Sequence, residues 1–160
     1  LAWYQAVQYC TWLSEKTGRM YTLPNEAQWE KAARGPEGNL YPWGNGWQDG
    51  CCNSQPAQVT AVDAFPPQGP YGCYDLVGNA REWTLSLWGE RRSEPDPVFA
   101  YPWRDDARND PQANTLVRRI FRGGAAEDPM DMTCTARNAF APDKSGPPGK
   151  RHGFRVVMQV

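Results

Sequence analysis

The chain lacks any apolar run approaching the roughly 18–20 residues that a membrane-spanning helix needs, so the sequence predicts no membrane span. It also lacks a block of charges of one sign. Its 17 basic and 18 acidic residues are interspersed along the chain, and the formal net charge is −1. Because nucleic-acid binding needs a concentrated positive surface, this pattern excludes nucleic acid as an expected partner.

The chain also has few of the residues that usually hold a metal ion or act as a base. His152 is the single histidine and has no neighbouring Cys or acid, so we expect a surface or loop residue and no hydrolase-type nucleophilic site. The cysteines show neither CxxC nor Cys/His spacing, which argues against a zinc site. Their disulfide pairing stays open, and the five are Cys10, Cys51, Cys52, Cys73 and Cys134.

The chain is rich instead in tryptophan, glycine and proline, with 8, 15 and 15 residues of each among 160. That length predicts one domain. Each buried aromatic ring removes about 150–250 Å² from water, so a few large rings can form a core between long ordered loops.

Two segments have helical periodicity. Residues 3–16 place Trp3, Ala6 and Cys10 on one face, and residues 25–34 begin at Asn25 with Gln28 three positions on, a pattern typical of a capping box. Short strands are expected at residues 59–62, 82–87, 117–122 and 153–160.

Eight short motifs occur in the order typical of one family. They are residues 6–12 (AVQYCTW), 22–35 (TLPNEAQWEKAARG), 41–45 (YPWGN), 62–67 (VDAFPP), 71–84 (YGCYDLVGNAREWT), 122–124 (RGG), 135–138 (TARN) and 153–156 (GFRV). In these motifs the chain resembles the formylglycine-generating-enzyme, or sulfatase-modifying-factor, family. The resemblance implies an α+β, C-type-lectin-like formylglycine-generating-enzyme fold with sparse secondary structure and long ordered loops.

The resemblance covers nearly the whole chain, residues 1–160, but begins partway through the family's domain. It therefore implies a domain that lacks its N-terminal part. Because a small domain without part of its core exposes apolar surface, we expect a protein or peptide partner, including a chain or segment that supplies the missing part. The chain starts at Leu1 inside a predicted helix, so the sequence predicts no compartment.

Catalytic members of this family carry two cysteines shortly after the RGG turn, which bind copper and oxidise a substrate cysteine to formylglycine with oxygen. The corresponding positions here are Asp128 and Thr133, four and nine residues past Gly124. Carboxylate and hydroxyl oxygens are harder ligands than Cu(I) prefers, so copper is not expected. The soft donors that remain nearby are Met130, Met132 and Cys134.

The family's calcium loop is better preserved. The resemblance assigns side-chain oxygens of Asp75 and Glu82, and backbone carbonyls of Gly78 and Ala80, as calcium ligands. Ca²⁺ favours such mixed oxygen donors. The alternative is that Asp75 and Glu82 stabilise turns or pair with Arg81 or a neighbouring Arg.

These observations favour a non-catalytic, calcium-binding member that acts as a protein- or peptide-binding or structural subunit. The sequence leaves two alternatives open. One is an enzyme of the wider family, either a copper-dependent cysteine oxidase or a relative of the sulfoxide synthases. The other is a diversified lectin-like ligand-binding protein with recognition residues between Gly124 and Phe154.

Overall fold

The computed structural model describes residues 1–55, 58–100, 102, 104, 106–125, 129–145 and 151–159. Its elements are α1 (Trp3–Thr17), β1 (Tyr21–Thr22), α2 (Glu26–Arg34), β2 (Arg81–Gly89), the 3₁₀ turns η1 (Pro97–Phe99) and η2 (Ala107–Asn109), β3 (Arg118–Arg122), the 3₁₀ turn η3 (Pro129–Asp131), β4 (Asn138–Phe140), β5 (His152–Phe154) and β6 (Val157–Met158). None of the helices in these ranges is both long and apolar enough to cross a membrane.

Both predicted helices are confirmed. α1 ends where Gly18 adopts the left-handed conformation, with φ of 68°. In α2 the Asn25 side chain accepts a hydrogen bond from the Gln28 amide at 2.8 Å, and the Gln28 side chain accepts one from the Asn25 amide at 2.9 Å. This reciprocal pair satisfies two amides that the first turn of a helix leaves without backbone partners.

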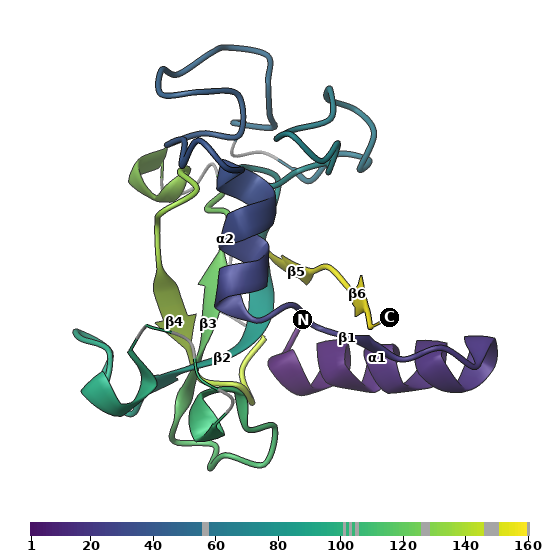
Figure 1. The fold of residues 1–160 in the computed structure, drawn as a ribbon, viewed down its shortest axis with the longest axis vertical. Coiled ribbons are helices and arrows are strands. Elements are labelled where there is room, and N and C mark those ends of the chain that lie inside the picture. The colour runs from purple at the N-terminus through teal and green to yellow at the C-terminus, as the bar shows by residue number, and fades with distance from the viewer. Residues whose placement is uncertain are drawn as a thin grey trace.

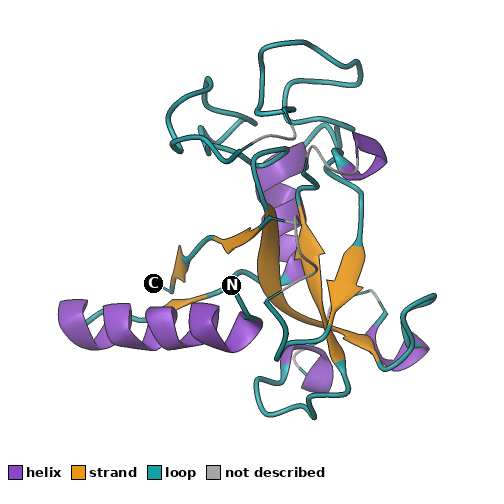
Figure 2. Ribbon diagram, turned by 180° about the vertical axis from the view of Figure 1, so that it is seen from behind, coloured by secondary structure: helices purple, strands orange, loops and turns teal. Residues whose placement is uncertain are grey.

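Four strands form the main sheet in the order β4-β3-β2-β5, and β1 and β6 form a separate pair. β5 runs parallel to β2, and the other pairs are antiparallel. α2 lies along one face of the main sheet, whereas α1 lies crosswise near β1 and β6 (Figure 1). The connections are long loops gathered at the two ends of the sheet (Figure 2).

Two strand predictions needed correction. Residues 59–62 form no strand, because Val59 and Val62 are exposed and the Thr60 amide donates to the Asn79 side chain at 2.9 Å rather than to a neighbouring strand. The single strand expected over residues 153–160 is divided between the two sheets as β5 and β6. Arg155 lies at the break and turns its side chain toward Glu82.

The core consists of two clusters built around tryptophan. One packs Trp29 of α2 against loop residues that include Leu76, Val77 and Cys134. The other packs Trp3 of α1 against Trp83 of β2 and Phe121 of β3. Leu23, Leu76 and Ile120 are buried as well, and the largest fully buried side chains are Trp3, Trp29 and Trp83.

Candidate functional site

The segment predicted to hold calcium, residues 75–82, is a tight loop that leads into β2. Asp75 and Asn79 have φ values of 51° and 60°, a region that only a few per cent of non-glycine residues adopt. Gly78 also has positive φ, and a Cβ there would lie 2.7 Å from the carbonyl oxygen of Asn53. Such a loop costs free energy and persists only where its surroundings stabilise it.

The side chain of Asn79 holds the loop closed. Its Nδ2 donates to Asp75 Oδ2 at 2.9 Å, and its Oδ1 accepts from the Thr60 amide and from Asn53 Nδ2. The other oxygen of Asp75, Oδ1, is buried and accepts no hydrogen bond from the described residues. Burial raises the pKa of Asp75, and the hydrogen bond from Asn79 opposes that rise. A buried carboxylate oxygen without a donor is suited to a cation.

Three of the four predicted calcium ligands share one cavity. Asp75, Ala80 and Glu82 line a hollow of about 360 Å³, which we call the calcium-loop cavity. Gly78 is not among its lining residues, and its amide donates to the carbonyl of Gly123 at 2.9 Å. The carbonyl of Ala80 accepts none of the hydrogen bonds found within the described ranges.

Arg155 also lines this cavity and pairs with Glu82, although Arg155 was not among the site residues predicted from the sequence. Its Nη2 donates to Glu82 Oε1 at 2.7 Å and to the Asp75 carbonyl at 3.2 Å, while Trp29 Nε1 donates to Glu82 Oε2 at 2.7 Å. The predicted alternative, pairing of Glu82 with a nearby Arg, is therefore present. Ca²⁺ favours oxygen donors such as Asp75 Oδ1 and the Ala80 carbonyl, and calcium at this cavity stays a prediction.

The RGG turn lies at the end of β3. It determines the backbone direction of the following segment, in which catalytic family members carry their two cysteines. Gly124 has φ of 60°, and a Cβ there would overlap the carbonyl of Asp131. This close approach brings η3 back against the turn. Asp128 lies outside the described residues, and Thr133 Oγ1 accepts a hydrogen bond from the Ala136 amide at 3.1 Å.

Cys134 is the one thiol of this segment and is fully buried. Burial raises its pKa to about 12, an effect that the positive charge of Arg122 opposes. The soft donors do not converge, because Met130 is 91% exposed whereas Met132 is buried. Nor does any group of three His, Cys, Asp or Glu side chains within the described ranges have the geometry to hold a metal ion.

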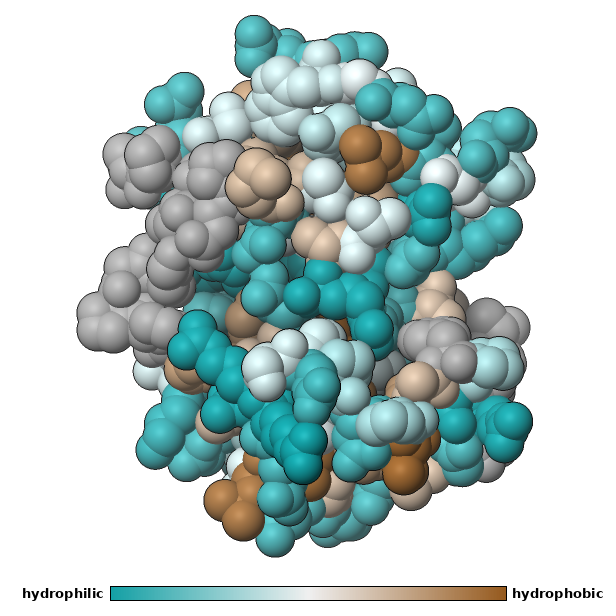
Figure 3. Space-filling view, turned by 90° about the vertical axis from the view of Figure 1, so that its left-hand side faces the viewer, coloured by the Kyte–Doolittle hydropathy of each residue, from teal (hydrophilic) through white to brown (hydrophobic). Residues whose placement is uncertain are grey.

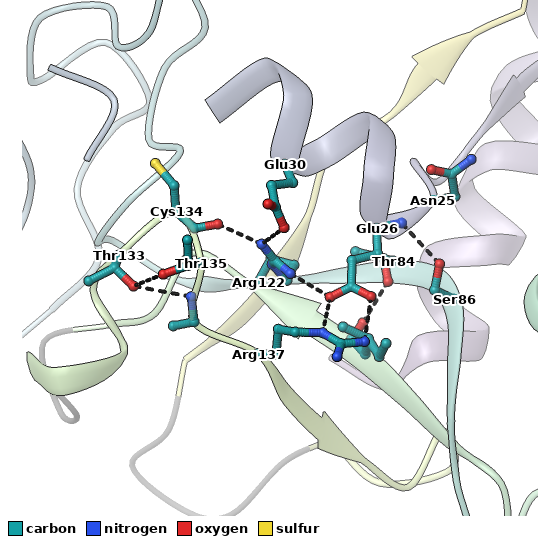
Figure 4. A network of polar contacts seen from close by, with 12 residues as sticks. Asn25, Glu26, Glu30, Thr84, Ser86, Arg122, Thr133, Cys134, Thr135 and Arg137 are labelled. Atoms are coloured by element: carbon teal, nitrogen blue, oxygen red, sulfur yellow. Dashed lines mark hydrogen bonds and ion pairs between the residues drawn. The ribbon is translucent and has the colours of Figure 1, made fainter. Parts of the chain in front are cut away.

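A buried charge network, which sequence reasoning missed, anchors this segment to α2. Arg122 of β3 pairs with Glu26 and, at 2.7 Å, with Glu30, and it donates to the Cys134 carbonyl at 2.5 Å. Arg137 donates to Glu26 through Nε at 2.5 Å and Nη2 at 2.8 Å. Figure 4 shows both guanidinium groups pointing at Glu26. The spacing of Glu26 and Glu30, one helical turn apart, was the available sequence signal.

A second cavity, of about 260 Å³, opens beside β4, and we call it the arginine pocket. Its described lining includes Arg81, Arg92, Arg137, Asp131, Phe140 and His152. Figure 3 views the molecule from the β4 side of Figure 1, where hydrophilic residues gather across the middle of the face. We expected a surface or loop position for His152, and the structure places it, half-buried, in a strand. It lies in β5, with ring centroids 5.8 Å from Trp83 and 6.2 Å from Phe140, because β5 pairs with β2 beside these rings.

Comparison with known proteins matches the Sulfatase-modifying factor enzyme 1-like domain over residues 1–160. The chain is 34% identical to the inactive C-alpha-formylglycine-generating enzyme 2 of Bos taurus, over 85% of this chain and 48% of that protein. It is 37% identical to the formylglycine-generating enzyme of Bos taurus, over 98% of this chain and 42% of that protein. The chain thus spans less than half the length of these two relatives.

Among solved structures, PvdO from Pseudomonas aeruginosa superposes with a TM-score of 0.68 at 24% identity, covering 100% of this chain and 60% of that one. At that identity the likeness concerns the fold. The predicted α+β fold with sparse strands and long ordered loops is confirmed.

Proposed function

Because this chain belongs to the sulfatase-modifying factor enzyme 1-like family, we propose that it is a non-catalytic member that binds a protein or peptide partner. The observation that carries the proposal is the replacement of the family's thiol pair by Asp128 and Thr133. Copper oxidation of this type needs two thiolates on one metal, and a carboxylate and a hydroxyl hold Cu(I) poorly.

The state of Cys134 supports the same proposal. A thiol that acts as ligand or nucleophile is accessible and has a lowered pKa. Cys134 is buried with a raised pKa, its amide donates to the Leu40 carbonyl at 2.8 Å, and its own carbonyl is held by Arg122. Moving this thiol toward a metal would break these backbone contacts.

A copper-dependent cysteine oxidase is the second candidate, favoured by the similarity to the formylglycine-generating enzyme of Bos taurus. The two candidates make different predictions in one assay. The chain is supplied with Cu(I), oxygen and a sulfatase-type cysteine peptide, and mass spectrometry follows the peptide. We expect the peptide to bind without conversion. Conversion to formylglycine that is lost in Cys134→Ala would overturn the proposal and identify Cys134 as the active thiol.

Calcium is the cofactor that this proposal includes, with Asp75, Ala80 and Glu82 as its ligands in the calcium-loop cavity. The carbonyl of Gly78 is the fourth ligand implied by the family resemblance. The expected role of the ion is structural: it gives the buried Asp75 Oδ1 a positive partner and ties the strained loop to β2.

The proposal also includes a contact surface for the protein or peptide partner on the outer side of α1. An aromatic face on α1 supports it: the rings of Trp12 and Phe154 each lie 5.4 Å from that of Tyr9, and Trp12 is 49% exposed. Solvent-exposed apolar faces of this kind mark interaction sites.

A further inference from the structure

We infer that the loop of residues 40–49, which we call the aromatic loop, is a contact surface for a positively charged side chain of a peptide partner. This inference rests on the proposed binding function. It adds a surface that lies away from α1, and it specifies the chemistry that the partner presents there.

Positive charge is absent from one long stretch of the chain. No Lys, Arg or His occurs between Arg34 and Arg81, whereas this stretch carries four carboxylates, those of Glu37, Asp49, Asp63 and Asp75. The rest of the chain holds all 17 basic residues, which leaves it 14 of the 18 acidic ones. The described loops of the stretch gather at one end of the molecule, in blue to teal at the top of Figure 1. Because carboxylates without neighbouring cations attract the opposite charge, this end favours a cationic partner.

Arginines from outside the stretch contact it, but their charges are already engaged. Those that donate to its backbone carbonyls are Arg34, Arg151 and Arg155. Arg34 also pairs with Glu30, and Arg155 pairs with Glu82. Asp49 takes part in none of the ion pairs found within the described ranges. Its charge is therefore available to a ligand.

The carboxylate of Asp49 is held at the edge of an aromatic cluster. Trp47 Nε1 donates to Asp49 Oδ1 at 2.8 Å. The rings of Tyr41 and Trp43 stack with their centroids 5.5 Å apart, and these centroids lie 5.7 and 5.8 Å from that of Trp47. Trp47 is nevertheless 43% exposed. Since a cation is attracted both by the face of a tryptophan ring and by a carboxylate, a guanidinium or ammonium placed here gains both contacts.

Backbone hydrogen bonds hold the aromatic loop in this shape before a ligand arrives. Tyr41 and Gly44 exchange hydrogen bonds at 2.8 and 3.0 Å. The Leu40 carbonyl accepts one from the amide of the buried Cys134 at 2.8 Å, which ties the loop to the core. A surface that is fixed in advance loses little conformational freedom on binding, which favours affinity.

The test uses the full chain and three capped tripeptides: Gly-Arg-Gly, the same peptide with citrulline in place of arginine, and Gly-Glu-Gly. Citrulline has nearly the shape of arginine but no charge. NMR follows the peptide signals and the tryptophan indole signals, with Trp47 assigned through Trp47→Phe. We expect the arginine peptide to bind about fivefold more tightly than the citrulline peptide, to shift the Trp47 signal, and to bind less tightly in added salt. Equal binding of the citrulline peptide, tighter binding of the glutamate peptide, or an unshifted Trp47 signal would overturn the inference.

Paired variants locate the site. Asp49→Asn keeps an oxygen for the Trp47 indole but removes the charge, and Trp47→Leu removes the ring, so each should weaken binding of the arginine peptide by about threefold. Asp63→Asn is the matched charge control, because Asp63 is an exposed carboxylate of the same stretch outside the aromatic loop. Trp12→Leu is the matched ring control, at a tryptophan of α1 that is 49% exposed. Equal losses within either pair would show a response to the general field or to any exposed ring, and would count against the aromatic loop.

The two levels of the proposal fail in different ways. Peptide binding without any preference for positive charge would remove this inference and leave the non-catalytic binding function standing. Conversion of a cysteine peptide to formylglycine would remove the binding-only function, whatever the aromatic loop binds.

Discussion

Arginine side chains fill positions that aliphatic residues occupy in most small cores. Arg119 and Arg122 are almost completely buried. Arg119 lies over the ring of Trp3 at 4.1 Å and donates to the Asp110 carbonyl at 2.7 Å, and burial lowers its pKa to about 10. The buried charge of Arg122 is instead neutralised by the carboxylates of Glu26 and Glu30. These residues tie loops to the sheet through polar contacts, which makes their partners sensitive to substitution.

Glu26 is the most sensitive of these partners. Glu26→Gln removes the carboxylate that Arg122 and Arg137 share while their guanidinium groups stay in place. Breaking a buried pair on one side leaves an uncompensated charge, so we expect a loss of about 3 kcal/mol in the free energy of unfolding, measured by urea denaturation. Glu30→Gln, at a carboxylate that is one-third exposed, is the control and should cost about 1 kcal/mol or less. Similar losses in both variants would contradict the central role of Glu26.

The buried thiols predict an alkaline loss of stability. Burial raises the pKa of Cys52 and of Cys134 to about 12, whereas a thiol in an unfolded chain ionises near about 8.5. The free energy of unfolding therefore keeps the full contribution of these neutral thiols below about pH 8.5. This contribution is lost as the pH rises toward 12, because in that window the two thiols ionise only in the unfolded chain. Cys134→Ala should flatten the fall of the unfolding free energy between pH 8 and 11. Cys51→Ala, at a partly exposed thiol, should leave that slope unchanged, and an unchanged slope in both would refute the linkage.

At the scale of elements, two tight turns fix how the loops pack against the strands. The RGG turn joins β3 to η3, and the calcium loop joins the loop region to β2. Both use positive φ and a close backbone approach, so glycine is required at Gly78 and Gly124 for steric reasons.

Gly124→Ala tests the RGG turn. The new Cβ would overlap the Asp131 carbonyl and sit at a φ that L-residues avoid, so η3 must move. We expect the free energy of unfolding to fall by more than about 2 kcal/mol. Gly18→Ala shares the positive φ but has open space around the Cβ, so it should cost only about 1 kcal/mol. If thermal melts show equal losses for the two variants, the contact with Asp131 is not what fixes the turn.

At the scale of the whole molecule, few regular elements are held together by side-chain contacts between distant segments. Glu82, Arg155 and Trp29 join β2, the C-terminal segment and α2 in one cluster. A ligand that binds this cluster in the folded state alone would stabilise the entire chain by mass action.

Calcium is the ligand expected to do so. Adding a chelator should lower the melting temperature of the chain, and restoring Ca²⁺ should reverse the change. Asp75→Asn keeps the hydrogen-bonding shape but removes a ligand charge, so it should abolish most of the chelator effect. Asp63→Asn is the matched control on the exposed loop nearby. A chelator response that is equal in Asp75→Asn and Asp63→Asn would place the calcium elsewhere, and no response in the unsubstituted chain would remove it.

Local patterns in the sequence determined the two helices, the turn glycines and the family, because helix periodicity, capping and backbone conformation depend on residues close together in the chain. They also determined that the thiol pair is replaced. Only the tertiary structure decided which charges meet: Glu26 pairs with Arg122 and Arg137, and Glu82 pairs with Arg155, across separations of 73 to 111 residues. It also placed the half-buried His152 in a strand beside aromatic rings, since the sheet pairing of β5 with β2 has no signature in the residues around it.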